Sequence, residues 1–306
     1  MKILLTGGCG FIFSHVAEHL SSKHEIHIVD GLLDGSNKDL IKLFEKKGIK
    51  VIIKKCEDLK KEDIHNDYDC IIHGAAESNV DKSIDNPSSV VVNNIKATEN
   101  MLNLALLQKN LKAFIYIGTD EIHGDTDEVV DGSKHQPRNP YAVSKSAGSE
   151  LTHAYHVTYD LPTIELRFCN VIGKRQDKTK LIPKIIHCLD NNEKFPIYDS
   201  GMAKREYIDV RDICTIIDKI LDQHGYFNFN IHCIKERLLL ITTGKSYSIL
   251  EVINKVESIY GKHLKIKNGT RKGHDMNYKM KSACFLRCMC YNSIESTIKW
   301  ILNKKK

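Results

Sequence analysis

The regular alternation of short β-branched runs with longer helical patterns over the first 170 residues most constrains how this chain can fold. Apolar strands that alternate with helices favour a parallel sheet covered on both faces. We therefore expect an α/β fold with a doubly wound parallel sheet, in which ligands bind at the carboxyl ends of the strands. The expected strands are 3–6, 25–30, 51–54, 69–73, 113–118 and 163–168, and the expected helices are 14–22, 90–108 and 141–159.

The alternation weakens after about residue 170, where strand-like and helical pieces are mixed. A length of 306 residues suits one large α/β domain with an appended lobe. We therefore expect residues 1–170 to form the sheet domain and residues 171–306 a smaller substrate-binding lobe. In such folds the chain often recrosses between the two parts.

The composition excludes several classes of protein. The chain has no run of 18 or more apolar residues, so no membrane span is expected, and its start lacks the pattern of a signal peptide. Ten cysteines without a secretory leader indicate a reducing, cytoplasmic setting and buried thiols. Cys284, Cys288 and Cys290, with His274 upstream, do not match a standard zinc spacing, so no metal is predicted.

The net charge of +6 suits an enzyme whose ligands carry phosphates. The lysines are spread along the chain, apart from the tail 304–306, and no basic stripe with interleaved aromatic residues is seen. We therefore expect no nucleic-acid partner.

A glycine-rich turn follows the first expected strand. Gly7 and Gly10 fit the first two positions of a G-x-x-G-x-x-G loop, which Phe11 and Ile12 continue into a helix whose N-terminus could bind a pyrophosphate. Phe13 stands where the third glycine normally allows close packing, which predicts a displaced helix or a remodelled loop. Glycines in this pattern would also suit a plain turn.

The following strands supply more residues of a Rossmann-type dinucleotide site. Asp30 ends the second strand, 20 residues after Gly10, where a carboxylate binds the ribose hydroxyls and favours NAD over NADP. Asp58 and Leu59 follow the third strand, where an acid could bond the adenine amine. Ala75 and Ala76 follow the fourth strand, where small side chains allow backbone contact with the cofactor. Surface acids and tight packing are the alternatives.

Three residues suggest a catalytic base. Tyr141 and Lys145 lie four residues apart and share one helix face, so the ammonium is expected to lower the phenol pKa. Thr119 closes the fifth strand, and its hydroxyl could bond the same substrate oxygen. The Y-x-x-x-K spacing also arises by chance in a lysine-rich chain, so its position after the fifth strand carries the weight.

Two adjacent carboxyl groups follow Thr119 directly. Asp120 and Glu121 come at the carboxyl end of a strand, inside the expected ligand crevice. Such a pair suggests separate duties as acid and base. An acid pair at a helix start, or an ion-paired surface, is the alternative.

These blocks resemble the extended short-chain dehydrogenases, and within them the dTDP-glucose 4,6-dehydratases. Residues 139–145, NPYAVSK, resemble N-P-Y-x-x-S-K, and residues 119–124, TDEIHG, are similar to T-D-E-V-Y-G. Residues 75–84, AAESNVDKSI, resemble A-A-E-S-H-V-D-R-S-I, and residues 271–275, RKGHD, resemble R-P-G-H-D. Further matches are Asn94, residues 180–183, residues 196–198 and Arg205 before residues 207–210. The likeness covers roughly residues 1–280.

The resemblance implies a nucleotide-sugar 4,6-dehydratase that uses NAD. Tyr141, helped by Lys145 and Thr119, takes the proton of the sugar 4-hydroxyl as hydride passes to NAD. Glu121 then removes the proton on carbon 5, and Asp120 protonates the departing 6-hydroxyl. Hydride returns to carbon 6 and leaves a 4-keto-6-deoxy sugar nucleotide.

The resemblance also implies ligand contacts and a partner. Asn94 is expected beside the cofactor, Asn170, Arg205 and Arg271 at the diphosphate, and a homodimer through helices 90–108 and 141–159 is favoured. The residues expected to bind the nucleotide sugar are Ser78, Asn79, Thr119, Asn170, Lys180, Leu181, Arg205 and Arg271.

Some positions depart from the family pattern. Asn79 replaces a histidine and His123 a tyrosine in or near the sugar pocket, which suggests an altered hexose such as a 2-acetamido sugar. Glu121 in place of lysine favours retention at carbon 5. Segments 230–240 and 283–291 do not fit the family pattern. The abundance of Lys, Ile and Asn suits an AT-rich genome such as that of a large DNA virus, where UDP-sugars are common, so UDP is favoured over dTDP.

Two alternatives stay open. A nucleotide-sugar 4-epimerase of the same family needs the tyrosine, lysine and threonine but no acid pair. A catalytically silent NAD-binding scaffold would need none of them.

Overall fold

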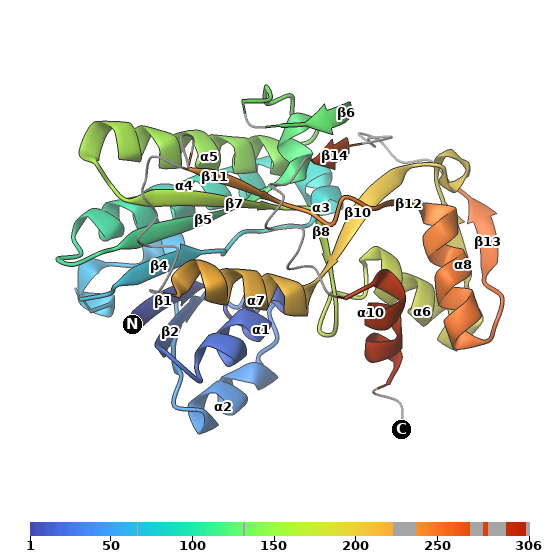
Figure 1. Ribbon diagram of the computed structural model, residues 1–306, viewed down its shortest axis with the longest axis horizontal. Helices are drawn as coiled ribbons and strands as arrows, with labels where there is room; N and C mark the ends of the chain where they lie inside the picture. Colours follow the sequence, from blue (N-terminus) through green and yellow to red (C-terminus); the bar gives the residue numbers. More distant parts are fainter. Residues whose placement is uncertain (66, 131, 223–236, 270–277, 281–291, 304–306) are drawn as a thin grey trace.

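A seven-stranded parallel sheet forms the centre of the protein (Figure 1). The computed structural model describes residues 1–65, 67–130, 132–222, 237–269, 278–280 and 292–303. The strands follow the order β11-β7-β5-β4-β1-β2-β3, which reverses direction beside β1, where open α/β sheets bind their ligands. The strands are β1 (Lys2–Thr6), β2 (Glu25–Asp30), β3 (Lys50–Ile53), β4 (Cys70–His73), β5 (Ala113–Thr119), β7 (Thr163–Phe168) and β11 (Leu238–Ile241).

Helices cover both faces of the sheet, as the alternating pattern predicts (Figure 1). Alternate strand residues point to opposite faces: Ile3 and Leu5 pack in one apolar cluster and Leu4 in another. The first cluster includes residues of α1 (Phe11–Leu20), α2 (Asp39–Lys46) and α7 (Val210–Leu221). The second includes residues of α4 (Pro87–Leu106) and α5 (Pro140–Tyr159), and the short α3 (Val80–Asp85) precedes α4.

A smaller lobe lies beside the sheet and has its own apolar core (Figure 1). A three-stranded sheet and a two-stranded sheet pack there with three helices. The elements are β8 (Asn170–Ile172), β10 (Lys204–Asp209), β12 (Ser246–Ser248), β9 (Lys194–Ile197), β13 (Lys265–Asn268), α6 (Leu181–Asn191), α8 (Ile249–Tyr260) and α10 (Ile294–Leu302). A further pair joins β6 (Thr126–Val129) to β14 (Tyr278–Met280).

Two elements after residue 170 belong with the large sheet. α7 packs on its face, and β11 pairs in parallel with β7, with Leu238 opposite Glu165. The end of the unusual stretch 230–240 is therefore the edge strand of the main sheet, whereas 230–236 lie outside the described residues. The division into domains at residue 170 stays a prediction.

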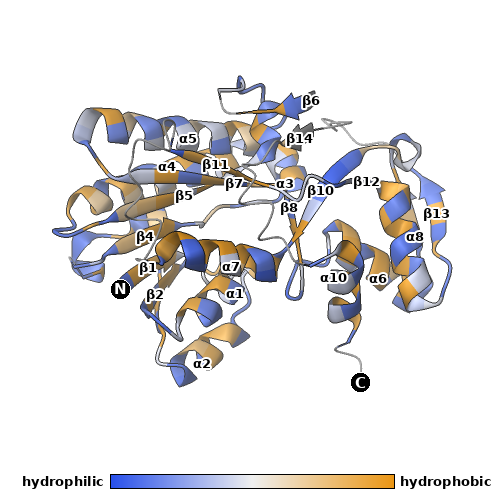
Figure 2. Ribbon diagram, in the orientation of Figure 1, coloured by the Kyte–Doolittle hydropathy of each residue, from blue (hydrophilic) through white to orange (hydrophobic). Residues whose placement is uncertain are grey.

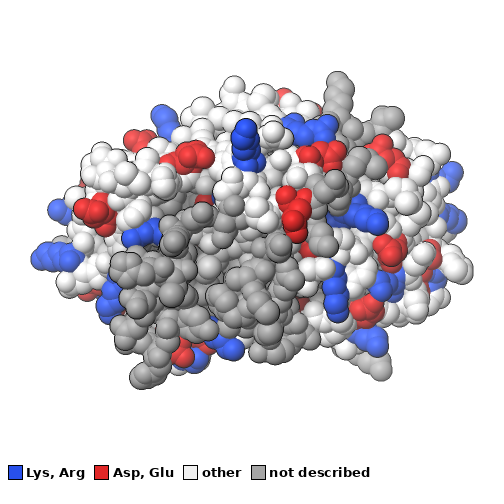
Figure 3. Space-filling model, turned by 45° about the horizontal axis from the view of Figure 1, so that its top comes forward, with Lys and Arg blue, Asp and Glu red and all other residues white. Residues whose placement is uncertain are grey.

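Apolar residues gather on the strands and on the helix sides that face them (Figure 2). Within the described ranges, no helix combines the length and apolarity needed to cross a bilayer. On the face drawn in Figure 3, acidic and basic side chains are intermingled. The six cysteines in the described part of the chain are all buried thiols, and the other four lie outside it.

Candidate active site

A pocket lies at the carboxyl ends of β1, β2, β4, β5 and β7 and is bounded by β8 and the start of α6. This is the edge where the doubly wound pattern predicts ligands. Most residues predicted from the sequence line it: Gly7, Gly10, Phe11, Ile12, Asp30, Ala75, Ala76, Ser78, Thr119, Asp120, Glu121, Tyr141, Lys145, Asn170, Lys180 and Leu181.

The glycine-rich turn brings backbone close to backbone. Gly7 has a φ of +75°, and a Cβ on it would come 3.0 Å from the backbone of Ala75. Gly10 precedes α1 and has no side chain to cap the first N–H groups, which leaves the positive end of the helix dipole open to an anion. These features fit the pyrophosphate of a dinucleotide.

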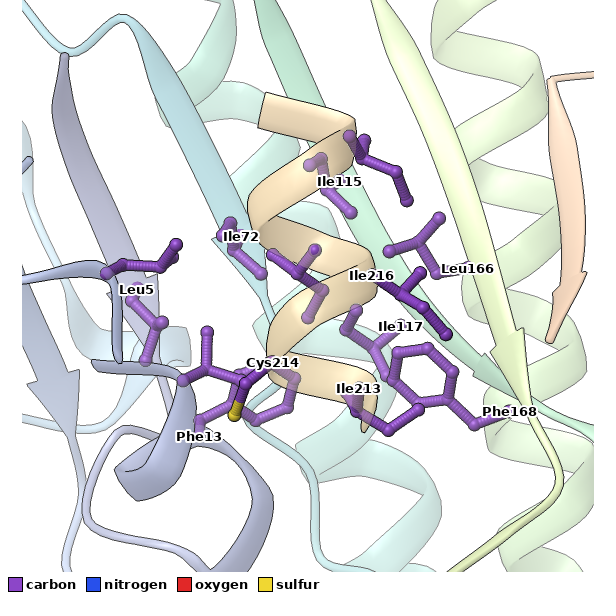
Figure 4. Packing of buried hydrophobic residues seen from close by; sticks show 14 of the residues in the cluster. Leu5, Phe13, Ile72, Ile115, Ile117, Leu166, Phe168, Ile213, Cys214 and Ile216 are labelled. Carbon is purple, nitrogen blue, oxygen red and sulfur yellow. The ribbon is translucent and has the colours of Figure 1, made fainter. Parts of the chain in front are cut away.

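The expectation that Phe13 displaces the helix after this turn, or remodels the loop, stays a prediction. α1 begins at Phe11, directly after Gly10. The ring of Phe13 is 5% exposed and packs in the apolar core near Cys214 of α7 (Figure 4). The cofactor end of the pocket therefore stays open.

Asp30 is placed to bind a ribose. Its carboxylate accepts hydrogen bonds from the backbone N–H groups of Cys9 and Leu32, each at 2.8 Å, and from Ser36 Oγ at 2.9 Å. A carboxylate has about four lone-pair sites, so one acceptor position remains for a ligand hydroxyl. The buried carboxylate and the glycine turn together fit NAD.

Several predicted residues lie elsewhere. Asp58 is exposed and Leu59 is buried in the core, and neither lines the pocket, whereas Cys56 and Glu57 do. Asn94 is also buried outside the pocket lining and bonds the backbone of Glu77.

Three of the residues predicted to bind the sugar or the diphosphate are not found in the pocket lining. The side chain of Asn79 caps α3 by accepting from Lys82 N at 3.0 Å, and it does not line the pocket. Arg205 does not line it either, although its charge acts on Asp120. Arg271 lies outside the described residues. The binding roles of all three stay predictions.

Sequence reasoning missed a second group of pocket residues. The loop after β2 contributes Gly31, Leu33 and Ser36, and the loop after β8 contributes Gln176. Both loops follow strand ends, and the position of the first next to Asp30 could have indicated it. Gln176 lies in none of the sequence blocks that resemble the family, so those blocks could not have indicated it.

Two buried polar atoms in the pocket wall have no partner within the described residues: Asn170 Nδ2, a donor, and Gln176 Oε1, an acceptor. An unsatisfied buried polar group is costly. A polar ligand would satisfy both.

Strand β5 and a 3-10 turn, η3 (Asp120–His123), present the carboxyl pair. Thr119 ends β5, and its hydroxyl donates to Asp120 Oδ1 at 3.3 Å and accepts from Glu121 N at 3.4 Å. Asn139 caps α5 by accepting from Ala142 N at 2.8 Å, and its Nδ2 donates to Glu121 Oε2 at 3.2 Å. The turn is thus tied to the helix that carries Tyr141.

Asp120 has the electrostatics of an acid. Burial raises its pKa to about 8, and the neighbouring charge of Glu121 adds to the rise. The positive charge of Arg205 and a hydrogen bond with Thr119 oppose it. Asp120 is therefore mostly protonated at neutral pH and can donate a proton.

The phenol of Tyr141 differs from expectation. Burial, together with the charges of Glu121 and Asp120, raises its pKa well above the ordinary value, and only a hydrogen bond with Thr119 opposes the rise. Lys145 lies with its Nζ 4.2 Å from the centre of the Tyr116 ring, and burial lowers the pKa of the ammonium to about 8 despite the charge of Glu165. The prediction that Lys145 lowers the phenol pKa is thus wrong: burial and the charges of Glu121 and Asp120 raise it, and Lys145 is not among the groups that act on it.

No metal centre is formed by the described residues, among which no group of three or more His, Cys, Asp or Glu is placed to hold an ion. The cysteine-rich segment and His274 lie outside them.

A known family model, described as the NAD dependent epimerase/dehydratase family, matches residues 3–231 of this chain. The chain belongs to this family. NAD as cofactor and membership of the extended short-chain dehydrogenases are therefore confirmed.

Among the family's curated members, a low-salt glycan biosynthesis protein, Agl12, of Haloferax volcanii is 33% identical over 91% of this chain and 89% of its own length. A dTDP-D-glucose 4,6-dehydratase of Mus musculus is 32% identical over 92% of this chain and 81% of that protein. A trifunctional UDP-glucose 4,6-dehydratase of Arabidopsis thaliana is 32% identical over 85% of this chain, which spans only 40% of that longer protein. The predicted likeness to the nucleotide-sugar 4,6-dehydratases is confirmed.

Solved structures of the family share the fold. A dTDP-glucose 4,6-dehydratase of Streptomyces venezuelae, which holds NAD, superposes with a TM-score of 0.87 at 26% identity over 100% of this chain and 98% of that one. A UDP-glucuronic acid 4-epimerase of Bacillus cereus gives 0.86 at 22% identity over 99% and 100%. Overall shape therefore does not separate dehydratases from epimerases.

Proposed function

We propose that this protein is an NAD-dependent nucleotide-sugar 4,6-dehydratase, which converts a nucleotide-linked hexose to its 4-keto-6-deoxy form. The observation that carries the proposal is the carboxyl pair Asp120 and Glu121 in the pocket wall beside Thr119 and Tyr141. A 4-epimerase has no use for this pair, because it neither removes the proton on carbon 5 nor expels the 6-hydroxyl.

The first step needs a base at the 4-hydroxyl. Tyr141 takes that proton, and Thr119 orients the phenol and the sugar oxygen by hydrogen bonding. The glycine turn and Asp30 would hold NAD, which would supply the hydride acceptor for carbon 4, the hydride donor for carbon 6 and a positive charge. A positive charge near Tyr141 would favour its ionised form, which burial disfavours in the protein alone.

The second step loses water across carbons 5 and 6. Glu121 removes the proton on carbon 5, which the neighbouring 4-keto group makes acidic, and it gives a proton back to carbon 5 when hydride reaches carbon 6. Asp120, kept protonated by burial, donates its proton to the departing 6-hydroxyl. Two adjacent carboxyl groups with different environments thus divide the acid and base duties.

The nucleotide end of the substrate belongs beside β8 and α6. Asn170 and Gln176 supply a buried donor and a buried acceptor that have no partner in the part of the chain that the structure describes. Lys180 donates from Nζ to Ser78 O at 3.2 Å and so joins the two walls of the pocket next to the expected diphosphate. We favour a UDP-sugar, glucose or its 2-acetamido form, with dTDP-glucose as the alternative, and we favour retention at carbon 5.

A homodimer through α4 and α5 is part of the proposal. Both helices carry large apolar side chains that are exposed in the single chain, including Val92 at 52% and Val157 at 66%. Sedimentation of the wild type and of Val157→Glu tests the dimer, which predicts a smaller species for the variant.

A cytoplasmic location without a nucleic-acid partner also stays a proposal.

The experiment that tests the activity is incubation of the wild type with NAD and, separately, UDP-glucose, UDP-N-acetylglucosamine and dTDP-glucose. Mass spectrometry of the products should show loss of one water molecule from at least one substrate. An isomer of unchanged mass would indicate a 4-epimerase, and no conversion of any substrate would indicate a silent scaffold.

The variant Glu121→Gln tests how the roles are assigned. It should oxidise carbon 4 yet release no water, so that enzyme-bound NADH accumulates, because the base at carbon 5 is lost. Loss of such a base typically slows a step about 10²–10⁴-fold. Normal turnover by this variant would refute the assignment.

A further inference from the structure

A buried charged network lies beside the turn that carries the carboxyl pair. Arg167 on β7 is 3% exposed and donates to Nε2 of His123 at 2.8 Å. His123 is the last residue of η3, is 2% exposed and does not line the pocket, whereas Asp120 and Glu121 in the same turn do. The turn is thus held by one end while its other end faces the ligand.

We infer that His123 is a positioning residue: its hydrogen bond from Arg167 fixes η3 so that Asp120 and Glu121 face carbons 5 and 6 of the sugar. The inference rests on the proposed function and deepens it. It concerns only the water-loss step, because Tyr141 and Lys145 are carried by α5 rather than by η3.

The partners of His123 fix its protonation. Arginine has donors only, so Nε2 of His123 must accept, which places the remaining proton on Nδ1. Nδ1 then donates to the carbonyl oxygen of Lys134 at 3.2 Å. The pKa of His123 is lowered to about 4 by burial and by the charge of Arg167, so the ring stays neutral and keeps both bonds.

Arg167 is itself held rigidly. Its Nε and Nη2 each lie 2.9 Å from Oε1 of Glu165, and Nη2 also donates to Ser149 Oγ on α5 at 3.3 Å. Ser149 in turn donates to Oε2 of Glu165 at 2.5 Å. Glu165 and Ser149 thereby fix the Nε and Nη2 side of the guanidinium, and Nη1 is left to donate to His123.

The network also reaches the strand that leads into the turn. A Cβ on Gly118, the residue before Thr119, would lie 2.2 Å from Oε1 of Glu165. The absence of a side chain at residue 118 therefore lets the carboxylate lie against the end of β5. The start of the catalytic turn rests on Glu165 and its end on Arg167, so the turn is supported at both ends.

The test compares two rates in one mixing experiment, using whichever of UDP-glucose, UDP-N-acetylglucosamine and dTDP-glucose the wild type dehydrates. Absorbance of bound NADH follows oxidation at carbon 4, and mass spectrometry of quenched samples follows water loss. His123→Leu should leave NADH formation close to wild type and slow water loss on the order of tenfold to a hundredfold, as expected when acid and base are slightly misplaced. Bound NADH should then accumulate.

Two conservative variants keep the test decisive if His123→Leu does not fold. His123→Gln places an amide oxygen near the position of Nε2 and can still accept from Arg167. Its rates of oxidation and of water loss should therefore both be close to those of the wild type. His123→Asn places its amide near Nδ1 and does not reach Arg167, so it should accumulate NADH.

His156→Leu is the matched control. His156 also bonds a backbone carbonyl, that of Leu161 at 3.0 Å, but it lies about 22 Å farther along α5 than Tyr141 at 1.5 Å per residue. This variant should behave as the wild type. Equal slowing of both steps by the His123 variants, or no change in either, would overturn the inference, whereas a wild type that dehydrates no substrate would instead overturn the proposed function.

Discussion

The ring of Phe13 occupies the space that a side chain at residue 74 would fill. A Cβ on Gly74 would lie 2.1 Å from Cε2 of Phe13, so the two residues fit only together. Gly74 follows β4 and Phe13 lies in the first helix; both line the pocket, and Phe13 also packs in the apolar core (Figure 4). The missing third glycine of the loop is thus compensated by a glycine on the neighbouring strand end.

Gly74→Ala should destabilise the protein by about 1–3 kcal/mol, as overpacking of a closed core does. Phe13→Leu shortens the ring side chain and should relieve most of this cost in the double variant. Urea unfolding of both single variants and the double variant measures the coupling free energy. Strictly additive effects would show that the two residues do not share this space.

Asp120 should make stability depend on pH. Its folded pKa of about 8 lies above the ordinary 3.8, so the folded state binds the proton more tightly than the unfolded state does. The stability that this group contributes is present below about 3.8 and is lost as pH rises through about 8. The free energy of unfolding of Asp120→Asn, measured from pH 5 to 9, should fall less with pH than that of the wild type. Parallel curves for the two proteins would contradict the buried acid.

The same ionisation should limit turnover. If Asp120 donates the proton to the 6-hydroxyl, water loss should decline as pH rises past about 8, while oxidation at carbon 4 does not decline with it. Stopped-flow absorbance of bound NADH separates the two steps. A water-loss rate that stays constant or rises at alkaline pH would exclude Asp120 as the acid.

Tyr141→Phe should abolish the first step. The variant keeps the ring and the packing but lacks the hydroxyl, so oxidation at carbon 4, followed as NADH formation, should slow by about 10²–10⁴-fold. Binding of the nucleotide sugar, measured by calorimetry, should stay within a few-fold of wild type. NADH formation at the wild-type rate would point to a different base.

Asn139 joins helix capping to the carboxyl pair, and two substitutions separate these roles. Asn139→Ser can still cap α5 but lacks the amide that donates to Glu121, so stability should be kept while water loss slows. Asn139→Ala loses both contacts and should also cost about 0.5–2 kcal/mol of stability. Urea unfolding and turnover of the two variants make the comparison, and equal turnover of Asn139→Ser and wild type would remove Asn139 from the site.

Much of the sheet could be predicted because its strands are buried on both faces and therefore read as continuous apolar runs. The sequence pattern predicts the strand 163–168 to the residue, and it correctly predicts that Thr119 and Tyr141 lie at the pocket. It does not predict that Asp58 and Asn79 lie outside the pocket lining, because a position near a strand end does not determine which way a side chain points. Asn79, for example, points back to cap α3.

Contacts between residues distant in sequence could not be predicted. The strand β11 joins the sheet through its pairing with β7, whose partner residues lie 73 positions earlier, and nothing local indicates this pairing. The compensation of Phe13 by Gly74 and the bond from Arg167 to His123 also depend on tertiary packing. The raised pKa of Tyr141 could not be predicted either, because the sequence shows that Lys145 is near but does not show how deeply the phenol is buried.

The most direct test of the central claim is the mass of the product that the wild type forms from its nucleotide sugar in deuterated water. Removal of the proton on carbon 5 by Glu121, with return from solvent, predicts a product lighter by one water molecule that carries one deuterium at carbon 5. An isomer of unchanged elemental composition, without deuterium on carbon, would contradict the proposed dehydratase activity and the proposed roles of Asp120 and Glu121.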